Sequence, residues 1–352
     1  MFRPIEVSAG VAADKRRTVA VNDRLGEPRL RELLRSQFGV FQLICLPLVS
    51  GADCFGVMVL FSREGRPSCT PEDLELLGSM AGLVAISLER FRAHRRRADQ
   101  QQLERELDDA RKVQDLLLPG ELPRSPRFEV ASKYAQASRV GGDYYDVIGL
   151  DRGLAVVLAD VSGHDIGAAM LMAMGRSVVR MILGVSGDSA VPHAPCVLPG
   201  ELLGRTNDVL AVDTPSERFV SMAAAILDHG TGTVCYSNAG GPFPLLLRRG
   251  SARIVELTQG GLPLGVLGGQ TYADETLALD PGDLLAFYTD GLEEARSLSG
   301  ELFGVERIES LLISHRDRPT QDLVDTMYQE SLAFTEQGRF QDDFTLVVVR
   351  AR

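Results

Sequence analysis

Aspartate recurs at the ends of apolar, strand-like runs in the C-terminal two thirds of this chain. Four acidic motifs carry it: GGDYYD at residues 141–146, LADVSGH at 158–164, YTDGLEEAR at 288–296 and DDFTLVVVR at 342–350. Apolar runs such as LAVVLA, LLAFYT and FTLVVV flank these aspartates, and their β-branched and aromatic residues predict buried strands. Because aspartate is unfavourable inside a strand, its repeated position at strand ends needs a reason.

Carboxylates gathered at one place repel one another, and a bound cation relieves that repulsion. No nearby Cys or His pattern accompanies the motifs, so their hard oxygen ligands favour Mg²⁺ or Mn²⁺ over zinc. The pattern therefore predicts metal-assisted hydrolysis of a phosphate ester. For a single aspartate, a turn or helix-cap role is the simpler interpretation. We assign that simpler role to Asp146, Asp151 and Asp165.

The length, the net charge and the lack of long apolar runs limit which class of protein this chain can belong to. With 352 residues, the chain is long enough for two domains and a linker. It has no apolar run of membrane-spanning length and no secretory signal, so we expect a cytoplasmic protein without a membrane partner. Its net charge of −11 argues against a general affinity for nucleic acid.

Residues 38–90 form a recognisable block. Residues 38–50 and 54–64 predict two strands, and Thr70 before Pro71 predicts the start of a helix. That helix should present one apolar face, formed by Leu74, Leu77, Met80, Ala81, Val84 and Leu88. The block resembles the C-terminal half of a GAF sensor domain. A complete GAF domain has more chain before this region than the 37 residues present, so we expect a partial GAF-like domain over residues 1–90.

Residues 91–118 predict a helical linker. Residues 89–117 contain neither Gly nor Pro and are highly charged. Apolar residues near a 3.5 spacing, although with a slip in phase, favour a two-stranded coiled coil and hence a homodimer. The seam would contain Val84, Leu88, Phe91, Ala98, Leu103, Leu107, Ala110 and Leu117. A single solvated helix is the alternative.

Residues 119–352 predict a second domain. Three prolines between residues 119 and 126 prevent the linker helix from continuing. Beyond Phe128, strand patterns cluster at both ends of the segment, with helices between them. Two of those helices are expected at roughly residues 304–314 and 320–336. This order indicates an α+β fold with a largely antiparallel core.

The stretch from Ala110 to Arg350 resembles a metal-dependent protein serine/threonine phosphatase of the PPM superfamily. It is most similar to the bacterial subgroup of sporulation stage II E and RsbU-type phosphatases. The resemblance is carried by segments in the family's order: ARKVQDLLLP, VGGDYYD, ADVSGH, RTNDVL, YSNAG, GLPLGV, GDLLAFYTDGLEEAR, FGVER and DDFTLVVVR. It implies a central β-sandwich flanked by helices. Two departures from the subgroup's pattern, Asp165 after Gly-His and Gly241 after Asn-Ala-Gly, leave every metal carboxylate in place.

The resemblance also implies a role for each acidic position. Asp160 matches the carboxylate that bridges two divalent cations, Mn²⁺ or Mg²⁺, and the Val161 carbonyl matches the adjacent backbone ligand. Asp290 matches a second metal carboxylate. Asp342 matches the C-terminal ligand, with Asp343 as the competing choice. Asp143 matches an acidic residue that binds one metal directly or through water.

Such a site uses a metal-activated water and requires no protein nucleophile. Arg139 could hold a substrate phosphate oxygen, although an exposed arginine at a strand start is an equal alternative. His164 could protonate a leaving group, but a structural role in its turn is the simpler interpretation.

By resemblance, the substrate would be a small phosphorylated anti-anti-sigma protein of the STAS type, dephosphorylated at serine or threonine. Two alternatives remain open. One is a catalytically inactive phosphatase fold that serves as a binding module, and the other is a two-metal hydrolase of a small phosphorylated molecule.

Overall fold

The computed structural model divides the chain into two compact units, Met1–Arg105 and Glu106–Arg352. It describes residues 3–21, 28–63, 69–163, 165–186, 189–190, 197–215, 217–335 and 338–352. Within these residues, no helix is both long enough and apolar enough to span a membrane.

Unit 1 is built on a small antiparallel sheet in the order β1-β2-β3. Its elements are α1 (Arg3–Lys15), β1 (Val19–Val21), α2 (Pro28–Phe38), β2 (Gln42–Ser50) and β3 (Asp53–Ser62). The two strands expected from the sequence are confirmed as β2 and β3. The elements before them were not predicted. Ala12 and Leu34, from α1 and α2, join a buried cluster with Leu43 on one side of the sheet.

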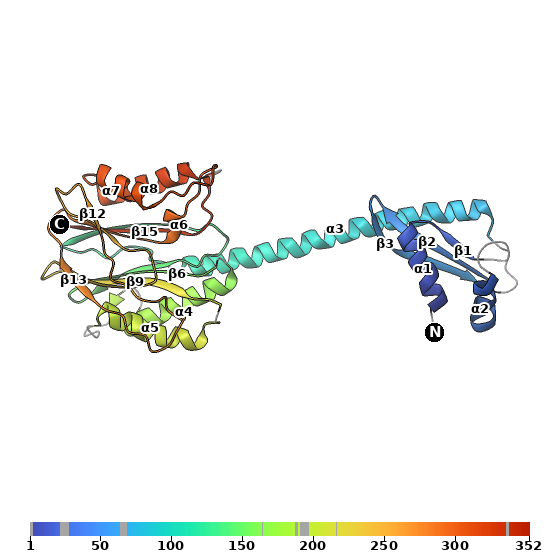
Figure 1. The fold of residues 1–352 in the computed structure, drawn as a ribbon, viewed down its shortest axis with the longest axis horizontal. Coiled ribbons are helices and arrows are strands. Elements are labelled where there is room, and N and C mark those ends of the chain that lie inside the picture. Colours follow the sequence, from blue (N-terminus) through green and yellow to red (C-terminus); the bar gives the residue numbers. More distant parts are fainter. Residues whose placement is uncertain are drawn as a thin grey trace. The chain divides into compact units, whose positions relative to one another are not determined.

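Helix α3 (Pro71–Asp115) runs without a break from unit 1 into unit 2 (Figure 1). Its first turn has reciprocal caps: the Asp73 amide donates to Thr70 Oγ1 at 3.2 Å, and the Thr70 amide donates to Asp73 Oδ2 at 2.9 Å. Ala81 and Ala85 pack on the sheet of unit 1. The predicted apolar face is partly wrong, because Met80 and Val84 are 51% and 41% exposed.

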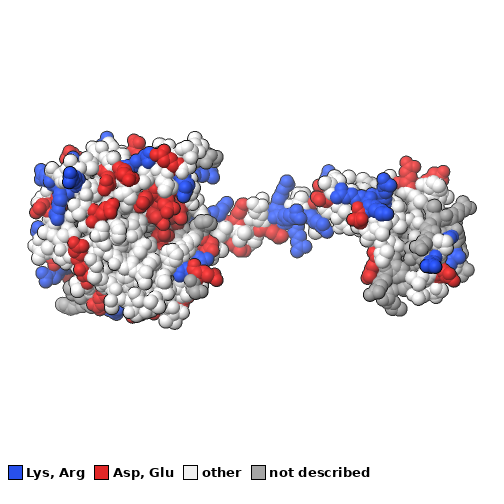
Figure 2. Space-filling view, in the orientation of Figure 1, with Lys and Arg blue, Asp and Glu red and all other residues white. Residues whose placement is uncertain are grey.

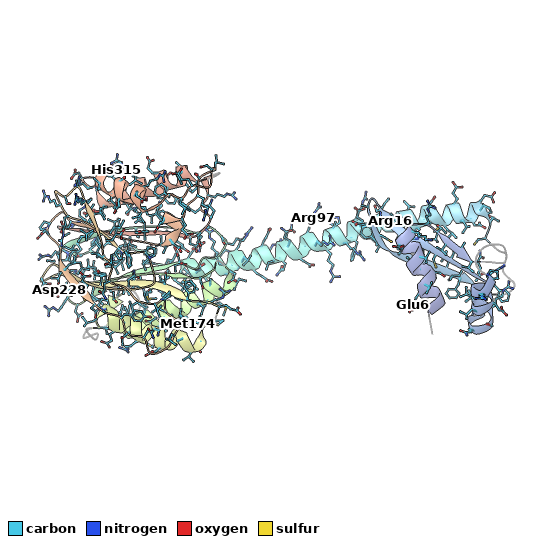
Figure 3. All side chains as sticks on the ribbon, viewed as in Figure 1. Glu6, Arg16, Arg97, Met174, Asp228 and His315 are labelled. Carbon is cyan, nitrogen blue, oxygen red and sulfur yellow. The ribbon has the colours of Figure 1, made fainter. Side chains whose placement is uncertain are left out.

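The middle of α3 is exposed to solvent. Every residue from 91 to 103 is exposed, including Arg97 (Figure 3). The arginines of this segment therefore form a solvated face, as a run of charged residues usually does.

Unit 2 contains two sheets. One has seven strands in the order β13-β10-β9-β6-β5-β8-β7, and the other has five in the order β12-β11-β14-β15-β4. All of their pairings are antiparallel except the single β5–β8 pairing. The expected α+β class with a largely antiparallel core is confirmed.

The strands are β4 (Phe128–Ala135), β5 (Tyr144–Leu150), β6 (Gly153–Val161), β7 (Val185–Ser186), β8 (Ser189–Ala190), β9 (Val220–Asp228), β10 (Thr233–Ala239), β11 (Leu245–Leu247), β12 (Ile254–Glu256), β13 (Glu275–Ala278), β14 (Leu284–Tyr288) and β15 (Phe344–Ala351). The helices are α4 (Ile166–Ile182), α5 (Pro199–Asp213), α6 (Asp290–Glu293), α7 (Val305–Ser314) and α8 (Thr320–Phe334).

The two sheets lie face to face, with α4 and α5 outside one and α7 and α8 outside the other (Figure 1). Alternation along β15 explains this layering. Val347 and Val349 pack in the core between the sheets, whereas Leu346 and Val348 pack against the outer helices. Both sides of the strand are therefore largely apolar, which leaves its ends as the favourable places for aspartate.

Candidate active site

Four segments bring the acidic motifs together at one end of the sandwich, where the strands that carry them begin or finish. Asp143 precedes β5, Asp160 lies near the end of β6, Asp290 begins α6 directly after β14, and Asp343 precedes β15. Because β5 pairs with β6 and β14 pairs with β15, both in antiparallel register, each pair of motifs meets at one end of its sheet. Figure 2 shows acidic side chains gathered where Figure 1 places α6.

Asp143 links the two sheets. It is 1% exposed, and its Oδ2 accepts hydrogen bonds from Thr289 Oγ1 at 2.8 Å and from Thr345 Oγ1. Burial raises the pKa of Asp143 well above its usual range, and the negative charges of Asp160 and Asp343 raise it further. The two threonine hydrogen bonds act in the opposite direction.

Asp160 is influenced by the charges of three other aspartates. Burial raises the pKa of Asp160 to about 7, with further contributions from the carboxylates of Asp290, Asp342 and Asp343. Gly142, which has no side chain, leaves space next to the carboxylate of Asp160. A β-carbon at Gly142 would lie 2.6 Å from the Val161 carbonyl oxygen and 3.5 Å from Asp160 Oδ1. The absence of a side chain at Gly142 therefore lets both oxygens lie close to this point of the loop.

Asp290 and Asp342 complete the acidic group. Burial raises the pKa of Asp290, and the nearby charges of Asp342 and Glu294 raise it further. Asp342 is exposed. Gly291 permits the close approach between the two segments, because a β-carbon there would come within 2.0 Å of the Asp343 carbonyl oxygen.

Asp343 differs from its neighbour. It is 2% exposed, and its carboxylate accepts backbone hydrogen bonds from Ala137 at 2.8 Å and from Gly142 at 2.8 Å. These bonds occupy one oxygen each and hold the loop that carries Gly142 and Asp143. The carboxylate of Asp343 thus binds backbone amides of another loop, whereas Asp342 Oδ1 accepts, among the described residues, only the amide of the adjacent Asp343.

The donor set fits a hard divalent cation in its chemistry. Three carboxylates, Asp160, Asp290 and Asp342, lie near enough for their charges to raise pKa values within the group, and the Val161 carbonyl lies beside them. Among the described residues, however, no three acidic, histidine or cysteine side chains already form a closed set of metal ligands. The side chains would have to converge to bind a metal.

The two other candidate residues have different positions. Arg139 donates to Asp108 on α3, so its guanidinium is engaged by that helix. A role for Arg139 in binding phosphate stays a prediction. His164 lies outside the described residues.

Other interactions at this edge were not foreseen. Gln114, near the end of α3, is 4% exposed, and its side chain donates to the Gly141 carbonyl at 2.6 Å and accepts from the Gly141 amide at 3.0 Å. Arg218 donates through Nη2 to Asp165 Oδ2 at 2.7 Å. Its Nη1 is buried and has no hydrogen-bond partner within the part of the chain that the structure describes, and a β-carbon at Gly163 would lie 3.6 Å from it.

The simpler interpretation holds for two of the three aspartates and is wrong for the third. Asp151 lies in the turn between β5 and β6. Asp165 caps α4, accepting from the Ala168 amide at 3.0 Å. Asp146 is fully buried in β5, where Arg180 of α4 donates to both carboxylate oxygens at 2.7 and 3.1 Å. It is neither a turn nor a cap residue. Asp146 sits on the helix-facing side of the sheet, where Arg180 neutralises it.

Comparison with known proteins agrees with this architecture. The chain is 28% identical over 262 residues to Protein IcfG of Synechocystis sp., a match that covers 69% of this chain and 41% of IcfG. It therefore spans about two fifths of the length of that relative. It is 25% identical over 256 residues to the phosphoserine phosphatase RsbU of Bacillus subtilis, covering 73% of each protein.

Among solved structures, the SiaA-PP2C domain of Pseudomonas aeruginosa aligns with a TM-score of 0.61 and 20% identity, covering 72% of this chain and 98% of that domain. The fold of unit 2 is thus that of a PP2C domain, and the expected PPM-like sandwich is confirmed. A GAF domain model matches residues 1–88. The model of stage II sporulation protein E matches residues 150–352, more than half of the chain, and the chain belongs to that family.

Proposed function

We propose that this protein is a metal-dependent phosphoprotein phosphatase that hydrolyses phosphoserine or phosphothreonine on a small regulatory protein. One observation carries the proposal. Asp160, Asp290 and Asp342, from three separate segments, lie at one end of a PP2C-like fold, where burial and then the charges of Asp290 and Asp342 raise the pKa of Asp160. A protein keeps such mutually repelling carboxylates together at a cost in stability, and cation binding offsets that cost.

The acidic residues have distinct roles in this proposal. Asp160, Asp290, Asp342 and the Val161 carbonyl would hold two divalent cations, Mn²⁺ or Mg²⁺, with Asp143 contributing directly or through water. When bound, the cations would supply an activated water and neutralise charge on the phosphoryl group. Asp343 acts through the backbone by fixing the loop of Gly142 and Asp143.

Arg218 is the better candidate than Arg139 for contacting the substrate phosphate. Arg139 is engaged by Asp108. Arg218 is engaged by Asp165 through Nη2, but its buried Nη1, near Gly163, has no acceptor among the residues that the structure describes. Gly163 lies in the turn directly after Asp160 and Val161. A buried donor without a partner is costly, and a phosphate oxygen would satisfy it.

The resemblance favours a protein substrate over a small molecule, and the hollow beside Asp160 is consistent with it. The hollow beside Asp160, lined also by Ser221, Pro242 and Thr289, has a volume of about 10 Å³. Pockets that enclose small molecules are usually about 300–1,000 Å³. A phosphorylated side chain presented by a protein surface needs no such enclosure. By resemblance the partner is a STAS-type protein in the cytoplasm, and RsbU is named a phosphoserine phosphatase.

The remaining parts of the proposal concern assembly. Unit 1 and α3 would pass a signal to the phosphatase unit and join two chains through the exposed apolar residues of α3. Phe91 and Leu103, both on the expected seam, are 63% and 52% exposed. Burial of such residues against a second copy would be favourable.

Hydrolysis of p-nitrophenyl phosphate and of a phosphoserine STAS protein, with and without Mn²⁺, tests the function. We expect Mn²⁺-dependent turnover of both, and its loss in Asp160→Ala and Asp290→Ala. Turnover of the small ester alone would favour the small-molecule hydrolase. No turnover of either would favour a binding module, and wild-type rates in both variants would refute the site.

A further inference from the structure

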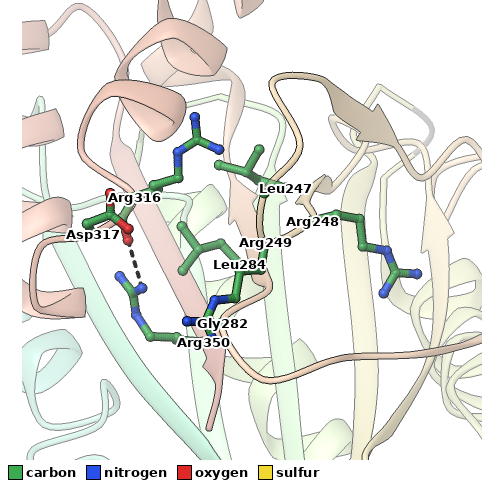
Figure 4. A pocket seen from close by; sticks show the side chains of 9 residues that line it. Leu247, Arg248, Arg249, Gly282, Leu284, Arg316, Asp317 and Arg350 are labelled. Atoms are coloured by element: carbon green, nitrogen blue, oxygen red, sulfur yellow. Dashed lines mark hydrogen bonds between the residues drawn. The ribbon is translucent and has the colours of Figure 1, made fainter.

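A polar cavity lies at the end of the five-stranded sheet that is opposite to the acidic group. Strand β14 runs from Leu284 at the cavity to Tyr288 next to the acidic group, and β15 returns from Phe344 to Arg350 at the cavity. The cavity has a volume of about 550 Å³. Figure 4 shows its wall, and Figure 2 shows basic side chains gathered at the end of unit 2 where Figure 1 marks the C-terminus.

Four arginines and one aspartate line this cavity: Arg248, Arg249, Arg316, Arg350 and Asp317. The nearby carboxylate of Asp283 already accepts hydrogen bonds from protein groups. It is 1% exposed and accepts from Arg248 Nη1 at 2.7 Å, from the Arg249 amide at 2.7 Å and from the Asp280 amide at 2.9 Å. The lining therefore keeps an excess of positive charge in a protein whose net charge is −11.

The other guanidinium groups bind mainly neutral oxygens. Arg350 donates to Thr320 Oγ1 and to the carbonyls of Arg316 and Arg318, and Arg316 Nη1 donates to the Ser251 carbonyl at 2.5 Å. Burial lowers the pKa of Arg350, although the charges of Glu129 and Asp317 act in the opposite direction. These bonds position the arginines, and Glu129 and Asp317 balance part of the charge of Arg350.

Several donors in the cavity have no protein partner. Among the described residues, the side-chain hydrogen bonds of Arg249 are limited to one from Nη1 to the Pro281 carbonyl at 3.4 Å, and Arg316 makes none through Nη2. Arg249 is exposed, so the fold does not require its guanidinium at this place. The hydrogen bonds of Arg350 to neighbouring loops are enough to explain its presence by a structural role. The single long hydrogen bond of Arg249 is not.

We propose that this cavity binds a small anion carrying a diphosphate group. Planar guanidinium groups pair with phosphate oxygens through two parallel hydrogen bonds, and they do so most strongly where water is partly excluded. The cavity falls within the usual size range of ligand pockets, about 300–1,000 Å³, and is larger than a single phosphate needs. A free diphosphate and a nucleoside diphosphate share this chemistry.

Calorimetric titration of pyrophosphate into the full chain, without divalent metal and at low salt, tests the site. Without metal, the acidic group repels anions, so binding there does not contribute. We expect pyrophosphate to bind, and Arg249→Gln to weaken the affinity about tenfold or more. Arg152→Gln, at an 83% exposed arginine outside the cavity, is the matched control and should bind as the wild type does.

Arg316→Gln gives a second variant at a different wall of the cavity and should also weaken binding. Thermal unfolding of each variant shows whether its fold is retained. A tighter affinity for adenosine diphosphate than for pyrophosphate would identify a nucleotide, and equal affinities would identify the diphosphate alone. No binding by the wild type up to about 1 mM, or equal affinities in wild type and Arg249→Gln, would overturn the proposal. Neither result depends on phosphatase activity.

Discussion

At the scale of single residues, two adjacent aspartates have opposite environments. Asp342 is exposed and its charge acts on Asp160 and Asp290, whereas Asp343 is buried and accepts backbone hydrogen bonds from the loop at Gly142. The sequence DDFT could not distinguish them, because both precede the same strand. The partners that separate them come from residues about 200 positions away in the chain.

Asp342→Asn and Asp343→Asn should therefore have different effects on the stability of the protein and on its stabilisation by Mn²⁺. Asp342→Asn should leave the melting temperature of the metal-free protein unchanged or raised, because it removes repulsion, but should abolish the stabilisation by Mn²⁺. Asp343→Asn should lower the metal-free stability by about 1–3 kcal/mol, because a carboxylate oxygen that serves the backbone is lost. Thermal unfolding with and without Mn²⁺ measures both. An equal Mn²⁺ shift in wild type and Asp342→Asn would contradict the assignment.

Arg218→Gln should raise the KM for p-nitrophenyl phosphate about tenfold or more, because the substrate phosphate loses a charge-assisted hydrogen bond. Arg139→Gln should change KM much less. Steady-state kinetics with Mn²⁺ measures both variants. Asp165→Asn is the structural control, since asparagine caps a helix as well as aspartate does and only the ion pair to Arg218 is removed. The same loss in Asp165→Asn and Arg218→Gln would show that Arg218 acts only on the fold.

At the scale of elements, buried polar contacts decide how helices meet the sheets. Arg180 of α4 and Asp146 of β5 form a nearly buried ion pair, and Tyr144 Oη also donates to Asp146 at 2.8 Å. Gln114 of α3 makes two hydrogen bonds to Gly141. The periodicity of apolar residues predicts most of the helices and strands of unit 2. It does not predict these pairings, because a polar residue on a strand is equally compatible with solvent.

Arg180→Met should lower the free energy of unfolding of unit 2 by about 3–5 kcal/mol, because Asp146 would remain buried without its cation. Urea unfolding measures this loss. Arg205→Met is the matched control, since Arg205 pairs with Glu201 on the surface of α5 at 50% exposure, and it should change stability by about 0.5 kcal/mol or less. Equal effects of the two substitutions would show that the buried pair contributes no more than a surface pair.

At the scale of the whole molecule, α3 belongs to both units. Its first part packs on the sheet of unit 1, and its last turns contact the loop before β5 through Asp108 and Gln114. Between these ends it exposes apolar side chains that neither unit covers. A single helix therefore joins the GAF-like unit to the loop that carries Asp143, and the same helix is the expected contact between two chains.

Phe91→Glu in the full chain should convert a dimer to a monomer, because a charge at the seam position would face its copy across the coiled coil. Leu83→Glu is the matched control: Leu83 is 67% exposed on α3 but lies outside the expected seam. Sedimentation equilibrium measures the mass of each variant. A monomeric wild type would remove the coiled-coil interpretation, and dissociation by both substitutions would place the contact elsewhere on the helix.

Local patterns in the sequence determined most of the catalytic unit. Aspartates at the ends of apolar runs indicated where Asp160 and Asp290 meet, since a strand buried on both faces accepts an unpaired charge most easily at its ends. Tertiary structure alone decided which carboxylates serve the backbone, which arginines remain free to bind an anion, and where the end of α3 docks. Each of these outcomes depends on hydrogen bonds and charges between residues far apart in the chain, and no local periodicity encodes them.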